Sequence, residues 1–167
     1  RKYKSESTTD IIANPLLPVA DTVRLLEGLP YALTNAQKKA WQEIESDMDA
    51  TLPMNRLLQG DVGSGKTLVA LMSMLIALDN GYQACMMAPT EILAQQHYNG
   101  LAPLLESVGI RCALLTGSTK AATKRSISAQ LASGEIDFAI GIAPDFRTRC
   151  EIMSLWVFGI CELSCKN

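Results

Sequence analysis

Short apolar runs alternate along this chain with segments whose apolar residues have helical spacing, and this alternation predicts the order of strands and helices. Short apolar runs of strand length lie at 55–59, 83–88, 111–115 and 136–142. Between them, apolar residues at helical spacing predict helices over 66–78, 90–107 and 119–132. Strands joined through helices require right-handed crossovers, which make the strands parallel. We therefore expect a three-layer α/β fold built on a parallel sheet.

The chain before residue 55 predicts a connecting segment followed by two helices. Residues 1–18 are polar and contain two prolines towards their end, and 19–28 has helical spacing up to its final glycine. Thr34 is a candidate N-cap for a helix that runs to about Asp49. We expect residues 1–28 to be a linker or the end of a preceding domain, and 29–142 to form the main domain. Because residue 1 is Arg and not Met, we also expect the chain to be part of a longer protein.

Composition limits the class of protein. Of the 167 residues, 48% are hydrophobic and 19% are charged, which is typical of one globular domain and not of a disordered chain. The formal net charge is −2, so any nucleic-acid site would be a local patch. Polar residues interrupt every apolar run before the ~20 residues that a bilayer requires, so we expect no membrane span. The five cysteines form no CxxC pair and follow no secretory signal, which indicates reduced thiols and a cytoplasmic protein.

The most specific chemical motif is the run Gly60-Asp61-Val62-Gly63-Ser64-Gly65-Lys66-Thr67. It matches the phosphate-binding pattern G-x-x-x-x-G-K-[ST] and lies between a predicted strand and a predicted helix. Its glycines let backbone N–H groups surround phosphate oxygens, and the helix N-terminus adds a positive dipole end. Lys66 would reach the β- and γ-phosphates, and the Thr67 hydroxyl would help hold Mg²⁺. A simple glycine-rich turn is the alternative, but the position of the run favours an ATP site with Lys66 and Thr67 as its catalytic residues.

Gln37 has two interpretations. Thr34 and Gln37 fit a capping box, in which each side chain bonds the backbone of the other residue. The segment 33–37 also resembles the Q-motif of superfamily 2 helicases, where a glutamine amide pairs with N6 and N7 of adenine. The two roles are compatible, so we include Gln37 among the nucleotide-binding candidates.

Two further segments resemble DNA-contacting motifs of the same superfamily. In 87–98, which is similar to motif Ia, Pro89 stops a strand and Thr90 caps a helix whose N-terminus can accept a DNA phosphate. The segment 114–118 is similar to motif Ib, a second loop at a strand end. An ordinary strand-to-helix junction is the alternative for each. We expect contacts with the DNA backbone from Pro89, Thr90, Glu91, Thr116 and Gly117.

A basic cluster follows the second of these segments. Lys120, Lys124 and Arg125 could extend the phosphate contact, or they could form a solvated helix face. Both interpretations stay open at this point.

Together, the segments 29–34, 54–67 and 87–98 are similar to the RecG family of superfamily 2 DNA helicases. The resemblance covers about 19–141. It implies a RecA-like motor domain in a monomeric enzyme that uses ATP and Mg²⁺ to remodel branched or forked DNA during recombination and repair. The motor of a transcription-repair coupling factor is the nearest alternative, although it usually differs just before and inside the phosphate loop. A P-loop ATPase with no role on DNA would require the other resemblances to be accidental.

The resemblance ends near residue 142. The family would continue to an Asp-Glu-x-His box about 20 residues later, which holds Mg²⁺ and activates water, but this chain contains no Asp-Glu pair. The segment 155–161 is apolar enough to replace the missing strand, although we assign no strand there. Codons for this segment, read one base over, can encode residues that resemble the expected continuation of the family. We therefore interpret 143–167 as an aberrant, frameshifted tail. A divergent C-terminus is the alternative. In either case we expect the chain alone to bind nucleotide without turnover.

Overall fold

The computed structural model describes residues 27–28, 32–50, 54, 56–142 and 155–159. Within these residues the chain forms helices α2 to α5 and strands β1 to β4. In chain order they are α2 (Asn35–Met48), α3 (Lys66–Asp79), β1 (Gln83–Ala88), α4 (Glu91–Ser107), β2 (Cys112–Leu115), α5 (Ala121–Ala132), β3 (Phe138–Ile142) and β4 (Leu155–Gly159).

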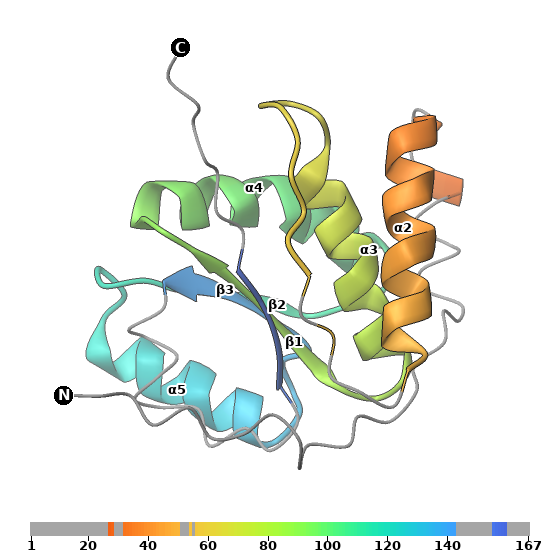
Figure 1. Cartoon of the computed structure of the whole chain (residues 1–167). Coiled ribbons are helices and arrows are strands. Elements are labelled where there is room, and N and C mark those ends of the chain that lie inside the picture. The colour runs from red at the N-terminus through yellow and green to blue at the C-terminus, as the bar shows by residue number, and fades with distance from the viewer. Residues whose placement is uncertain (1–26, 29–31, 51–53, 55, 143–154, 160–167) are drawn as a thin grey trace, which may run out of the picture.

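The strands form one parallel sheet in the order β2-β3-β1-β4. Helices α3 and α4 cover one face of the sheet and α5 covers the other (Figure 1). The predicted parallel three-layer α/β fold is therefore confirmed. No helix of the described residues is both long enough and apolar enough to cross a membrane.

Side chains of the central strands alternate between the two faces, as a strand requires. On β1, Ala84 and Met86 belong to the cluster under α3 and α4, whereas Cys85 belongs to the cluster under α5. On β3, Phe138 and Ala139 divide in the same way. This two-sided burial explains why these strands read as continuous apolar runs.

Helix α3 is buried on all sides. Residues 68–77 are all buried, and the single hydroxyl among them, on Ser73, donates to the Val69 carbonyl at 2.8 Å. One side packs on β1 and β4, and the other side packs on α2, where Ile44 and Met48 complete the cluster. Burying each large apolar side chain stabilises the fold by ~1.5–3 kcal/mol, so this helix is the main internal support.

The predicted strand at 55–59 is wrong, because residues 56–59 have no regular structure and residue 55 lies outside the described residues. Two side chains of this segment contact α2, whereas Leu57 between them is 73% exposed. Arg56 forms ion pairs with Asp47 at 2.6 Å and Glu43 at 2.7 Å. Leu58 packs on the cluster between α2 and α3. The segment is therefore attached to α2 by its side chains and has no described strand partner.

Two further segments differ from the sequence-based predictions, and others lie outside the described residues. Helix α5 begins at Ala121, two residues later than predicted, because 116–119 forms its own turn. The segment 155–159, to which we assigned no strand, forms β4 and pairs in parallel with β1. Most of the predicted 19–28 helix lies outside the described residues, as do 143–154 and 160–167.

The two cysteines that the structure describes lie in the core, and neither forms a disulfide. Cys85 is buried and Cys112 is half-buried. Burial, together with the nearby Glu106 carboxylate, raises the pKa of the Cys112 thiol to about 12. The thiol is therefore neutral at physiological pH and acts as a small apolar group.

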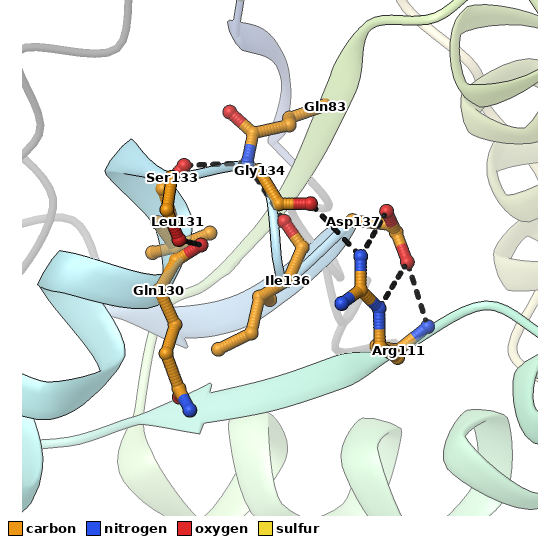
Figure 2. Close-up of polar contacts among 8 residues, drawn as sticks. All are labelled: Gln83, Arg111, Gln130, Leu131, Ser133, Gly134, Ile136 and Asp137. Atoms are coloured by element: carbon orange, nitrogen blue, oxygen red, sulfur yellow. Dashed lines mark hydrogen bonds and ion pairs between the residues drawn. The ribbon is translucent and has the colours of Figure 1, made fainter.

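A polar cluster fastens the turn between α5 and β3 to the sheet (Figure 2). The Gln83 amide nitrogen donates to two carbonyl oxygens, of Leu131 at 2.8 Å and of Ile136 at 2.7 Å. Beside it, Arg111 pairs with the Asp137 carboxylate and donates to the Gly134 carbonyl. One side chain at the start of β1 thus bonds to two carbonyls that lie 48 and 53 residues further along the chain.

Replacing Gln83 by Met keeps the length of the side chain and removes both donors. We expect Gln83→Met to lower the free energy of unfolding by ~1–3 kcal/mol, because two partly buried carbonyls lose their hydrogen bonds. Urea unfolding measures the change. Gln96→Met, at an exposed position on α4, is the matched control and should stay near the wild-type value. Equal values for the two variants would contradict the role assigned to Gln83.

Candidate functional site

The topology brings the predicted site residues to one edge of the sheet. Helix α3 packs on β1 and leads into it through a tight turn, so its N-terminus lies towards the carboxyl ends of the strands. The loops that follow β1 and β2 leave from the same edge because the strands are parallel. In open α/β sheets this edge is where ligands bind.

The phosphate loop owes its shape to two glycines. Gly63 has φ 80° and Gly65 has φ 82°, both in the left-handed region that other residues adopt only with strain. Gly65 is also the N-cap of α3. The first N–H groups of a helix have no acceptor within it, so this loop ends on backbone donors suited to an anion.

Lys66 bonds to the loop that contains it. Its ammonium donates to the carbonyl oxygens of Gly60 at 2.8 Å and Asp61 at 2.7 Å. The positive charge thus lies across the first turn of the loop, and a phosphate there would compete with these carbonyls for the same protons. The predicted strand before the loop is absent, but the helix that Lys66 begins is present.

Gln37 connects α2 to the phosphate loop. The predicted capping box is confirmed: the Thr34 N–H donates to Gln37 Oε1 at 2.9 Å, and the Gln37 N–H donates to Thr34 Oγ1 at 3.2 Å. In addition, Gln37 Nε2 donates to the Ser64 carbonyl at 2.9 Å. A carboxamide has two donors and two acceptor lone pairs, so adenine recognition stays a prediction beside these bonds.

Thr67 is the second residue of α3 and is half-buried. The described residues contain no group of three metal-ligating side chains that could hold a metal ion. Mg²⁺ is commonly bound by one or two protein groups together with substrate phosphates, and a Thr67 hydroxyl beside the loop fits that donor set.

A separate concavity lies on the outer side of α2. It is open, and its wall includes the ion pairs of Arg56 described above. None of its lining residues belongs to the phosphate loop; they are Lys39, Gln42, Glu43, Ser46, Asp47 and Arg56. We therefore do not include it in the candidate site.

The loop after β1 leads directly into α4. Pro89 and Thr90 are exposed, and Thr90 is the N-cap, whose Oγ1 accepts from the Leu93 N–H at 3.3 Å. This bond uses an acceptor lone pair and leaves the hydroxyl hydrogen available to a phosphate. Glu91, in the first turn of α4, accepts from the Ser118 N–H at 2.8 Å.

The loop after β2 is bonded within itself. Thr116 is only 5% exposed, and its hydroxyl lies 3.0 Å from that of Ser118 and 3.1 Å from that of Thr119. Gly117 and Ser118 are exposed. Of the two predicted DNA contacts here, Gly117 presents its backbone to solvent, whereas the Thr116 side chain supports the loop from inside.

Sequence patterns missed the two bonds that join these segments across the site. Neither the bond from Gln37 to Ser64 nor the bond from Ser118 to Glu91 has a local signature, since each joins residues 27 apart in the chain. At the start of α5, Lys120 is the N-cap, Arg125 is exposed and Lys124 is half-buried, and both interpretations of this basic cluster stay open.

Comparison with known proteins gives consistent findings. The sequence model of the DEAD/DEAH box helicase family matches residues 34–149. The ATP-dependent DNA helicase RecG of Streptococcus pneumoniae is 56% identical over 114 residues, which are 68% of this chain and 17% of that protein. RecG of Bacillus subtilis is 47% identical over 121 residues, 72% of this chain and 18% of that protein. The predicted resemblance is thus confirmed, and the chain spans less than a fifth of the length of these relatives.

Solved structures show the same similarity as the sequence comparison. The structure of RecG bound to a three-way DNA junction matches with a TM-score of 0.82 and 39% sequence identity, over 91% of this chain and 21% of that one. The helicase MrfA matches with a TM-score of 0.56 at 21% identity, which shows a shared fold.

The loop geometry predicts different effects at two glycines with the same backbone conformation. Gly65→Ala and Gly109→Ala each place a Cβ at φ near 80°, so we expect each to lose ~1–2 kcal/mol of stability. At Gly65 the new Cβ would also collide with Gln37 Nε2, whereas at Gly109 it would meet nothing within 4 Å. Only Gly65→Ala should weaken the binding of a fluorescent ATP analogue, by about tenfold or more. Equal analogue binding by the two variants would contradict this account.

Proposed function

This chain belongs to the DEAD/DEAH box helicase family, and on that premise we propose that it supplies the nucleotide-binding part of an ATP-dependent DNA helicase. The reaction is ATP hydrolysis coupled to the remodelling of branched DNA, such as stalled forks and Holliday junctions. The observation that carries the proposal is the phosphate loop, with two left-handed glycines at the N-terminus of a buried helix and Gln37 bonded to its backbone. The enzyme would work as a monomer in the cytoplasm.

Different residues of this chain would bind the phosphates, the Mg²⁺ ion and the adenine of the nucleotide. The glycine turns and the first amides of α3 would bind the phosphates, and Lys66 would exchange its two carbonyl partners for phosphate oxygens. Thr67 would hold Mg²⁺, which neutralises developing charge on the transferred phosphoryl group when bound. Gln37 would place the adenine while it holds the loop through Ser64.

On the DNA side, the exposed Pro89 and Thr90 and the Gly117 backbone would contact the sugar-phosphate chain. Helix N-termini and backbone amides suit phosphate because they provide donors without a base preference. Lys120 and Arg125 would extend this contact along α5. The RecG structure with a three-way junction supports branched DNA as the partner, since this chain superposes on that protein.

Removal of the loop lysine tests the proposal. In the product of the complete gene, we expect Lys66→Ala to reduce ATPase activity stimulated by a forked duplex by about 100-fold or more, because the main cationic contact to the phosphates is lost. Phosphate release measures the rate. Lys39→Ala, on the outer side of α2, should leave it unchanged. Full DNA-stimulated ATPase in the Lys66→Ala protein would refute the assignment.

A nucleotide-binding chain without turnover is the second candidate function. The observation that favours it is the absence of any Asp-Glu pair from the whole sequence, although β4 lies beside β1 where a following strand would be expected. We propose that 143–167 is read out of frame and that the parent enzyme keeps the acidic pair.

The gene decides between these candidates. We expect the nucleotide sequence from the codon of Phe138 onwards to give an Asp-Glu-x-His box in a shifted frame, followed by a second motor domain. An intact frame that stops after Asn167 would favour nucleotide binding alone. In that case the purified 167-residue chain should show no DNA-dependent phosphate release.

A further inference from the structure

One hydrogen bond joins the two loops that we assign to the DNA backbone. The Ser118 N–H, in the loop after β2, donates to Glu91 Oε1, in the first turn of the helix after β1, at 2.8 Å. In the sheet β3 lies between β1 and β2, so the bond joins segments that leave from strands two positions apart, about 10 Å. It therefore connects parts of the edge that do not pair directly through the sheet.

The fit between the two loops is tight at Gly117. A Cβ built at this position would lie 2.7 Å from Glu91 Oε1, closer than side chains tolerate. The backbone bond at Ser118 and the absence of a side chain at Gly117 are separate features, and both place the carboxylate against the loop. A side chain at residue 117 would therefore make the Glu91 carboxylate shift from this position.

The chemistry of the carboxylate argues against a direct contact with DNA. An ionised carboxylate only accepts hydrogen bonds and repels phosphate, whereas phosphate oxygens need donors. Glu91 also uses one oxygen on the Ser118 amide. At the start of a helix its negative charge is favourable with respect to the helix dipole, so it can be held there without a cation.

The loop after β2 leaves a strand on which α4 packs. Its own bonds, from the Thr116 N–H to Thr119 Oγ1 at 3.2 Å and from the Thr119 N–H to the Thr116 carbonyl at 3.2 Å, hold its shape. The bond from Ser118 to Glu91 adds a direct link between the exposed part of this loop and the first turn of α4, next to Thr90.

We propose that Glu91 is a positioning residue that fastens the loop 116–119 to α4 and so fixes the spacing of the two phosphate-binding loops. This inference rests on the proposed function, because it concerns how the same surface engages DNA. It reassigns Glu91 from a predicted contact with DNA to a residue that acts through Ser118 and Gly117.

The first test needs no DNA. In the 167-residue chain, Glu91→Ala should speed hydrogen exchange of the Ser118 amide by about tenfold or more, because a hydrogen bond to a charged acceptor is lost. Glu91→Gln should stay near wild type, since the amide oxygen can accept the same bond. Unchanged exchange at Ser118 in Glu91→Ala would overturn the proposal.

The second test uses the product of the complete gene with a forked duplex. Glu91→Ala should raise the DNA concentration for half-maximal ATPase several-fold, leave the rate at saturating DNA unchanged, and be rescued in Glu91→Gln. Gly117→Ala should also raise that concentration, because its Cβ would displace the Glu91 carboxylate, and Gly100→Ala, where a Cβ meets nothing within 4 Å, should keep the wild-type value.

The outcomes separate this inference from the proposed function. If wild type responds to forked DNA and Glu91→Ala responds equally, the positioning role is refuted and the helicase assignment stands. If Ala and Gln both lower the DNA concentration required, Glu91 acts as a repelling charge and the positioning role is also refuted. If wild type shows no response to DNA at all, the proposed function itself fails.

Discussion

Residues 68–77 of α3 are all buried, and the position of the phosphate loop follows from that burial. A helix apolar on every side cannot lie on a surface, so it must pack between the sheet and a second helix. Here α2 provides that cover, and the contact between α2 and α3 also brings Gln37 to the loop. The polar chemistry at the N-terminus of α3 is thus held in place by apolar packing along the rest of the helix.

Most of the fold could be predicted from local patterns. Neighbouring residues determine the apolar runs of β1 and β3, the N-caps at Thr34 and Thr90, and the glycine-rich loop. The strand expected at 55–59 failed because a strand depends on a partner, and Arg56 is held by carboxylates of α2. The bonds at Ser64 and Ser118 could not be predicted, since each depends on two elements meeting in space.

The end of the sheet shows the difference between forming an element and supplying a function. Segment 155–159 pairs with β1 because an apolar run of strand length can satisfy its backbone on an open edge, whatever its side chains. Catalysis requires specific acids after that strand, and the whole chain has no Asp-Glu pair. Backbone pairing of this segment with β1 is thus a separate matter from the acidic residues that the proposed helicase would use after such a strand.

A chain of net charge −2 is proposed to bind phosphate at two places, the nucleotide and the DNA backbone. Both assignments depend mainly on backbone donors: glycine turns and helix N-termini, which present N–H groups without adding formal charge. An acidic residue can lie within such a surface when a backbone amide donates a hydrogen bond to its carboxylate, as the Ser118 N–H does to Glu91. Affinity built in this way depends on the exact spacing of loops more than on total charge. In this proposal Gln37 at one site and Glu91 at the other contribute to binding indirectly, because they hold the loops that touch phosphate.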